Sequence, residues 1–294
     1  TCWRRWTGLT RAGARCAVSW PGRVAWHYAE PWPAPNLAAM RSKAKLLVVT
    51  IDGPGGVGKS TVAKLLAREL QVMYLDTGAT YRALAYAALE ERLSPVTDVK
   101  PLARLAKRLP LRLARAAGGS LRVRLDGRDV SRDIRSERIS EAAAQVSQHA
   151  LVRAAMVALQ RRLAKRQRVV VEGRDTGSVV FPRAPFKFFL TAAAGVRAAR
   201  RQQELAKLYG TQPPLREVRE QLQFRDELDR SRRVGPLVKP RGAVTIDTTR
   251  RTARQVVRAM LAHIDSPGTA SLFPRSSDRK RETVPRLKRS RDSR

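Results

Sequence analysis

Short runs of apolar residues alternate with segments of helical period between residues 40 and 265. Each apolar run is nearly continuous, without a polar residue at every second position, which is typical of strands buried on both faces. The runs are Leu46–Ile51, Val72–Leu75, Arg168–Glu172, Phe186–Leu190 and Ala243–Asp247. Such strands, separated by helices, predict an α/β fold with a parallel five-stranded sheet that carries helices on both faces.

The helical segments show apolar residues at helical spacing and, in one case, a capping signal. Ser60–Leu70 follows the first apolar run, and a longer helical pattern extends over Ser140–Lys165. Thr252 and Gln255 have the spacing of a capping box, in which each side chain satisfies a backbone N–H group of the other residue. We therefore expect the last helix to begin just after Thr252.

The stretch 100–150 interrupts this rhythm with two segments that alternate apolar and basic residues, 111–115 and 121–125. A glycine-containing segment, 117–120, lies between them, and Asp126-Gly127 follows the second. Alternation of this kind between turn signals predicts a small antiparallel meander inserted in the α/β frame.

The two ends of the chain show no folded pattern. Residues 1–39 have no sustained period and precede Met40, so we expect a non-core extension that is disordered or lies upstream of the true start, with a targeting arm as the alternative. Residues 266–294 are basic, lack a hydrophobic face and are expected to be disordered. The folded domain is therefore predicted to span 40–265.

The net charge is +34, from 59 Lys and Arg against 25 Asp and Glu. This charge suits nucleic acid or a small polyanion, but no nucleic-acid-binding motif accompanies it, so nucleic acid is not expected as the main partner. No apolar run is long enough for a transmembrane helix, and no membrane partner is expected. Both cysteines, Cys2 and Cys16, lie in the first segment, which fits a reducing cytoplasm.

A phosphate-binding loop follows the first predicted strand. The pattern G-x-x-x-x-G-K-S/T is carried by Gly53, Pro54, Gly55, Gly56, Val57, Gly58, Lys59 and Ser60, with Thr61 next. Glycines let backbone N–H groups approach phosphate oxygens, and the following helix N-terminus adds partial positive charge. Lys59 is then expected to reach the β- and γ-phosphates of ATP, and the Ser60 hydroxyl to bind Mg²⁺.

Two large classes of P-loop protein are disfavoured by the rest of the sequence. The guanine-reading element Asn-Lys-x-Asp is absent, because the only asparagine, Asn36, precedes the loop. The apolar run 169–171 ends in Glu172 and Gly-Arg-Asp, whereas an ATPase motor usually ends this strand in Asp-Glu. Kinases that act on small molecules remain.

Candidate acceptor residues follow the second and third strands. Ligands of an open parallel sheet lie beyond the carboxyl ends of its strands, where Thr77 and Arg82 emerge. Arg82 is placed to meet an acceptor phosphate, and Glu172 to hold Mg²⁺ through water. The alternatives are a helix-capping turn at Thr77 and a surface ion pair between Arg174 and Asp175.

Arg225, Asp229 and Arg232 are spaced by four and three residues and would share one face of a helix. Two arginines around one aspartate can form a clamp for phosphate and ribose. The alternative is a solvated helix with surface ion pairs.

Taken together, these motifs resemble bacterial cytidylate kinase over residues 40–265. The matching segments are Ile51–Thr61, Leu75–Ala79 with Tyr81 and Arg82, Gly173–Asp175 with Gly177 and Val179–Pro182, and Arg225–Asp226 with Asp229, Arg232, Pro236 and Leu237. The resemblance implies a P-loop NTPase-type fold in which about 100–150 is the inserted monophosphate-binding region and about 207–236 a short lid. It implies Mg²⁺- and ATP-dependent phosphorylation of CMP and dCMP in pyrimidine nucleotide metabolism, and we expect a cytoplasmic monomer.

The resemblance also assigns roles to individual residues. The catalytic residues would be Lys59, Arg174, Arg225 and Arg232. The acceptor phosphate would be bound by Thr77, Arg82, Arg174 and Arg225, the ribose by Asp229, and the cytosine by Arg153 and Asp175, with Arg232 between the two phosphates.

Two positions depart from the family pattern: Ala144 stands where a serine commonly helps to hold the base, and Glu172 replaces a frequent aspartate. The alternatives are another P-loop nucleoside-monophosphate or small-molecule kinase and an RNA-binding nucleotide switch.

Overall fold

The computed structural model describes residues 47–115, 121–165, 167–210 and 212–265. Its main sheet has five strands in the order β2-β6-β1-β7-β8, and all neighbouring strands are parallel. The strands are β1 (Val48–Asp52), β2 (Met73–Asp76), β6 (Val169–Gly173), β7 (Phe186–Thr191) and β8 (Val244–Asp247). The predicted α/β fold with a parallel five-stranded sheet is confirmed.

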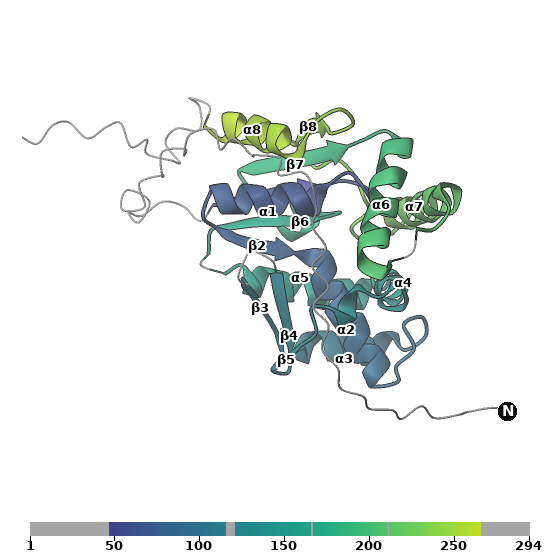
Figure 1. Cartoon of the computed structure of the whole chain (residues 1–294). Coiled ribbons are helices and arrows are strands. Elements are labelled where there is room, and N and C mark those ends of the chain that lie inside the picture. Colours follow the sequence, from purple (N-terminus) through teal and green to yellow (C-terminus); the bar gives the residue numbers. More distant parts are fainter. Residues whose placement is uncertain (1–46, 116–120, 166, 211, 266–294) are drawn as a thin grey trace, which may run out of the picture.

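Helices cover both faces of this sheet (Figure 1). Val170 of β6 belongs to the hydrophobic core formed with α1 (Lys59–Glu69) and α8 (Ala253–Ile264). Val169 and Val171 belong to the opposite core, against which Leu163 at the end of α5 (Ala150–Leu163) packs. Because consecutive strand residues face opposite sides and both sides are covered, the strand sequence is continuously apolar.

A second, antiparallel sheet lies at the lower end of the view in Figure 1, beside α2 (Thr77–Glu90) and α3 (Val99–Arg108). Its strands are β3 (Leu111–Arg115), β4 (Leu121–Leu125) and β5 (Arg128–Asp129), in this order. Asp126 and Gly127 both have positive φ, 48° and 78°, as a two-residue type I′ hairpin turn requires. The predicted meander and this turn are confirmed, whereas 117–120 lie outside the described residues.

The prediction of one long helix over Ser140–Lys165 is wrong. The structure has two helices there, α4 (Glu137–Val146) and α5, separated by 147–149. His149 has an extended backbone (φ −80°, ψ 120°), and the Ser147 hydroxyl donates to the carbonyl of Ala144 at 2.7 Å. Serine and histidine favour helix interiors only weakly. A serine hydroxyl that bonds a carbonyl of the preceding helical turn is compatible with a helix that ends there.

Two further helices, α6 (Ala194–Tyr209) and α7 (Leu215–Arg230), pack against each other beyond the carboxyl ends of the strands (Figure 1). Their contact is a small apolar core that includes Ala198, Leu205 and Val218. The pair therefore lies at the edge of the sheet where ligands of such folds bind.

The predicted strands agree with the observed ones to within about two residues, the usual uncertainty of element boundaries. Leu46 and the two ends of the chain, 1–39 and 266–294, lie outside the described residues. Within the described ranges, no helix is long and apolar enough to cross a bilayer.

The capping box at α8 allows a test of local stability. The Thr252 hydroxyl accepts from the backbone N–H of Gln255, and the Gln255 side chain accepts from the backbone N–H of Thr252. We expect Thr252→Ala to lower the free energy of unfolding by about 1 kcal/mol, because backbone donors lose their partner. Thr252→Ser, which keeps the hydroxyl, should lie close to the wild type in urea unfolding. Equal stability of the alanine and wild-type proteins would contradict this role.

Candidate functional site

The predicted phosphate loop connects β1 to α1, and its glycines have the backbone that the pattern requires. Gly56 and Gly58 have φ angles of 73° and 90°, values that residues with a Cβ rarely adopt. A Cβ at Gly56 would also lie 2.7 Å from the carbonyl oxygen of Arg197, so the loop is packed closely beneath α6. Its conformation is therefore fixed by the surrounding structure.

Lys59 and Ser60 open α1 at the end of this loop. The Lys59 ammonium is buried and donates to the carbonyl of Pro54 at 2.6 Å. Burial, followed by the positive charge of Arg174, lowers the pKa of Lys59 to about 7. A phosphate next to this ammonium would raise the pKa again, because an opposite charge favours the protonated form. Ser60 and Thr61 are exposed, so the helix N-terminus is open to a ligand.

Glu172 connects the end of β6 to Ser60. Its Oε2 atom accepts from the Ser60 hydroxyl at 2.9 Å, and its Oε1 atom accepts from the Tyr74 hydroxyl. Burial, with a smaller contribution from the charge of Asp76, raises the pKa of Glu172. A hydroxyl and a carboxylate side by side are oxygen donors of the kind that Mg²⁺ uses together with substrate phosphates. The residues present thus fit the predicted magnesium site.

The predicted acceptor arginines converge on the same edge, and protein groups hold each of them. Arg174 Nε donates to Asp229 at 2.7 Å, and Arg232 pairs with the other oxygen of the same carboxylate. Arg82 pairs with Asp76 at 3.0 Å, and Arg225 donates to the carbonyl of Ser140 at 3.2 Å.

Three of these arginines, together with Arg153, keep unused hydrogen-bonding capacity. Four buried guanidinium Nε atoms have no hydrogen-bond partner among the described residues, and they belong to Arg82, Arg153, Arg225 and Arg232. Unpaired buried donors are costly and are usually satisfied by a ligand or water. All four residues are among those that the sequence analysis assigned to the acceptor nucleotide.

Burial also lowers the pKa of two of these arginines. The pKa of Arg225 falls to about 10, with a further contribution from the charges of Arg174 and Arg82. The pKa of Arg232 also falls to about 10, with a further contribution from Arg153. Both groups are still protonated at neutral pH. A site in which positive charges repel one another is suited to bind a polyanion.

Arg153 and Asp175, the predicted base-reading residues, form a buried ion pair. Arg153 also donates to the carbonyl of Ser147 at 3.3 Å, and its guanidinium lies 5.8 Å from the centre of the Tyr81 ring. In the described part of the chain, the buried Arg153 Nε has no hydrogen-bond partner, and the pair with Arg153 uses Oδ2 of Asp175. The pair therefore keeps one unused donor on Arg153.

The interpretation of Arg225, Asp229 and Arg232 as one helical face needs correction. Helix α7 ends at Arg230, so Arg232 lies beyond it, where the chain turns back and Leu237 N–H donates to the carbonyl of Asp229 at 2.7 Å. Arg232 nevertheless bonds Asp229 from this turn, and both are buried. This burial argues against the alternative of ion pairs on a solvated helix. Arg174 and Asp175 also bind different partners instead of each other.

Thr77 is brought to the site but uses its hydroxyl elsewhere. Its Oγ1 donates to the carbonyl of Glu172 at 2.7 Å, and the residue is buried. The preceding residue, Asp76, accepts from the backbone N–H of Ala79 and caps α2. The predicted capping turn is thus present at the start of α2, with Asp76 as the capping residue.

Several site residues were missed from the sequence. Asp226 accepts from the Gly55 N–H at 3.0 Å and pairs with Arg197, which donates to the Gly55 carbonyl at 3.0 Å. Gly235 has φ of 64° and packs on the Arg153–Asp175 pair so closely that a Cβ would clash. Asp226 lies within a quoted motif and Gly235 next to one, but spacing alone gave no partner for either.

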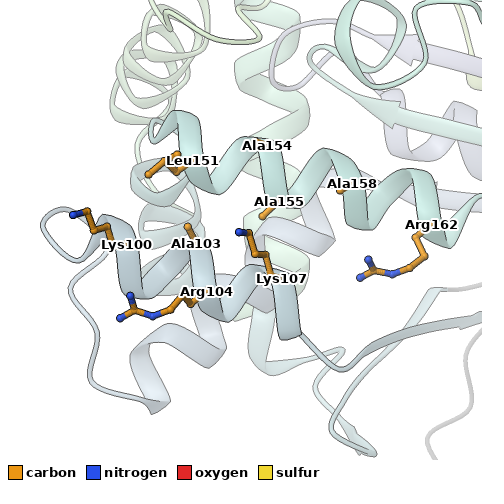
Figure 2. A pocket seen from close by; sticks show the side chains of 9 residues that line it. All are labelled: Lys100, Ala103, Arg104, Lys107, Leu151, Ala154, Ala155, Ala158 and Arg162. Carbon is orange, nitrogen blue, oxygen red and sulfur yellow. The ribbon is translucent and has the colours of Figure 1, made fainter.

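A separate hollow of about 570 Å³ lies between α3 and α5 (Figure 2). It is lined by Lys100, Ala103, Arg104, Lys107, Leu151, Ala154, Ala155, Ala158 and Arg162. None of the predicted site residues is among them, so this hollow is not the predicted nucleotide site.

The comparison with known proteins agrees with this geometry. The family model for cytidylate kinase matches residues 49–266. A cytidylate kinase of Caldanaerobacter subterraneus subsp. tengcongensis is 46% identical over 209 residues, which cover 71% of this chain and 90% of that protein. Cytidylate kinases of Desulforamulus reducens and Symbiobacterium thermophilum are each 42% identical, over 74% and 76% of this chain and 96% and 98% of their own lengths. The chain belongs to the cytidylate kinase family.

Proposed function

We propose that this protein transfers the terminal phosphate of ATP to CMP and dCMP, with ATP at the P-loop and the monophosphate among the arginines at the carboxyl ends of the strands. The main support for the proposal is the set of four buried Nε donors that have no hydrogen-bond partner among the described residues. All four belong to arginines that the family resemblance assigns to substrate binding. An acceptor nucleotide supplies phosphate, ribose and base oxygens or nitrogens that can satisfy such donors.

The donor side would work through the P-loop. Backbone N–H groups and the N-terminus of α1 bind the phosphates, and Lys59 neutralises charge on the β- and γ-phosphates. Asp226 accepts from the backbone N–H of Gly55 and Arg197 donates to its carbonyl, which keeps the loop in a fixed shape. This preorganisation lowers the free-energy cost of aligning the γ-phosphate.

On the acceptor side, no strong general base is required, because a nucleoside monophosphate is already ionised near neutral pH. The difficulty is to bring two polyanions together. Arg82, Arg174 and Arg225 bind the acceptor phosphate, and Arg232 lies where charge develops between the two phosphates. Thr77 would join them by turning its hydroxyl from the Glu172 carbonyl to the phosphate. Asp229 binds ribose hydroxyls.

Magnesium belongs to this proposal, with Ser60 as a direct ligand and Glu172 acting through water. Held by these two residues, the ion would supply positive charge that offsets the charge of the phosphates. The adjacency of Ser60 and Glu172, at 2.9 Å, supports this placement.

We further propose that about 207–236 acts as a lid and about 100–150 as the monophosphate-binding region of a core spanning 40–265, with 1–39 and 266–294 outside it. Closure over bound substrates would exclude water, which otherwise hydrolyses ATP. A cytoplasmic monomer completes the proposal.

An assay of ADP release with CMP, dCMP, UMP, AMP or RNA as the added acceptor tests the function. Turnover stimulated by CMP and dCMP supports the proposal. Turnover with another monophosphate alone would indicate a different kinase, and turnover stimulated only by RNA would indicate an RNA-binding nucleotide switch.

Lys59 provides the first test of the mechanism. We expect Lys59→Ala to lower kcat by about a thousandfold, because a charge that stabilises the transition state is lost. The circular-dichroism spectrum should be unchanged. Lys100→Ala, on the exposed face of α3, is the matched control and should keep full activity. Normal turnover of a folded Lys59→Ala protein would refute the assignment of the donor site.

Arg232 and Asp229 should separate kcat from KM. We expect Arg232→Ala chiefly to lower kcat, by about a hundredfold, because its contact strengthens as charge develops. We expect Asp229→Ala chiefly to raise the KM for CMP, by about tenfold, because its ribose contact persists throughout the reaction. Steady-state kinetics on both variants measure this. Equal effects on both parameters in both variants would contradict the division of roles.

The Arg153–Asp175 pair predicts the choice of base. Cytosine offers an amino donor to Asp175, whereas uracil places a carbonyl there, opposite another acceptor. We expect kcat/KM to favour CMP over UMP by about ten- to a hundredfold, at the low end because Ala144 supplies no hydroxyl. Asp175→Asn should narrow the ratio, because an amide can donate to the uracil carbonyl. Kinetics with CMP, dCMP, UMP and AMP on both proteins test this. Equal use of UMP and CMP by the wild type would refute this base pocket and leave the kinase assignment intact.

A further inference from the structure

Asp52, the last residue of β1, is a fully buried carboxylate that has no role in the mechanism above. Its Oδ1 atom accepts from the backbone N–H and the hydroxyl of Thr176, both at 2.8 Å. Its Oδ2 atom accepts from the backbone N–H of Gly177 at 2.7 Å. Three short hydrogen bonds therefore join the strand before the phosphate loop to a turn that lies 124 residues further along the chain.

That turn directly follows Arg174 and Asp175. In the proposed function, these two residues contact the acceptor nucleotide. Thr176 and Gly177 begin a single π-helical turn, Thr176–Val180. The contact with β1 is tight, since a Cβ at Gly177 would lie 2.7 Å from the hydroxyl oxygen of Thr50. The hydrogen bonds that Asp52 accepts from Thr176 and Gly177 thus set the position of the turn. They also set the position of Arg174 and Asp175 just before it.

A direct chemical role for Asp52 does not fit these contacts. Both oxygens are engaged and the residue has no exposed surface, so it can neither reach an acceptor oxygen nor bind an ion without losing the turn. Burial raises the pKa of Asp52, and the hydrogen bonds from Gly177 and Thr176 oppose this shift. Such a carboxylate, bonded only to neutral donors, is well suited to hold backbone in place.

We propose that Asp52 is a positioning residue that fixes the Thr176–Gly177 turn against β1 and thereby places Arg174 and Asp175 for the acceptor. This inference rests on the proposed function for the roles of Arg174 and Asp175. The residue after Asp52 is Gly53, the first glycine of the phosphate loop, so the turn is anchored beside that loop. A displacement of the turn by about 1 Å would be enough to lower the rate of transfer about a hundredfold.

Asp52→Asn tests the proposal with almost no change in shape. The donors of Thr176 and Gly177 lie opposite different oxygens, so one N–H must face the new amide NH₂ in either orientation. We expect the KM for the monophosphate to rise about tenfold and the ratio of CMP to UMP use to fall, while the KM for ATP changes less than about threefold. A structural role alone would lower thermal stability and leave these ratios unchanged.

Thr176 offers a matched pair of milder variants. Thr176→Val removes the hydroxyl bond to Asp52 and keeps the shape, whereas Thr176→Ser keeps the bond. We expect the valine variant to show the same effects as Asp52→Asn in weaker form. We expect the serine variant to keep the wild-type KM for the monophosphate and the wild-type ratio of CMP to UMP use. Equal KM values for the monophosphate in both variants, with normal CMP preference, would overturn the proposal.

Amide hydrogen exchange provides a readout that does not depend on activity. In Asp52→Asn and Thr176→Val, we expect faster exchange over 174–180 than in the wild type, with exchange in α8 unchanged. Unchanged exchange over 174–180 would overturn the positioning role. If the wild type uses UMP as well as CMP, base reading by Asp175 fails, but exchange and the KM for the accepted monophosphate still decide the role of Asp52.

Discussion

The parallel pairing of β1 with β6 is the constraint on which the site depends. In this register Asp52 lies opposite Gly173, so the phosphate loop and the Gly-Arg-Asp turn leave the sheet side by side. The pairing of β2 with β6 places Asp76 opposite Glu172 at the same edge. Because parallel strands all point their carboxyl ends in one direction, the residues proposed to bind the phosphate donor and the acceptor come from distant parts of the chain to one edge of the sheet.

Crowding of positive charge at this edge is balanced by carboxylates of the protein. Asp76 holds Arg82, Asp175 holds Arg153, and Asp226 holds Arg197. Without these partners, the partly or fully buried guanidinium groups would repel one another and destabilise the fold. With them, the guanidinium groups are held in place, and on the proposed function this reduces the reorganisation needed when the substrates bind.

The sequence predicted those parts of the fold that local chemistry determines. Continuous apolar strands, the glycine pattern of the phosphate loop and the Asp126-Gly127 turn depend on near neighbours along the chain. The break at 147–149 was missed because helical periodicity continues on both sides of it. Within the break, the Ser147 hydroxyl donates to the carbonyl of Ala144, and the His149 ring contacts the carbonyl of Pro95, 54 residues away in sequence. Asp52 and Asp226 were missed because their partners are 124 and 171 residues away in sequence, a separation that no spacing rule covers.

The carboxylate of Asp229 is shared between Arg174 and Arg232. A small free anion such as sulfate or inorganic phosphate would have to compete with Asp229 for both arginines while offering no hydroxyls for the carboxylate to bind in return. A nucleotide offers both at once, a phosphate for the arginines and ribose hydroxyls for Asp229. If Asp229 binds ribose as proposed, the shared carboxylate would discriminate against simple anions, because only a nucleotide compensates the carboxylate for the arginines that it gives up.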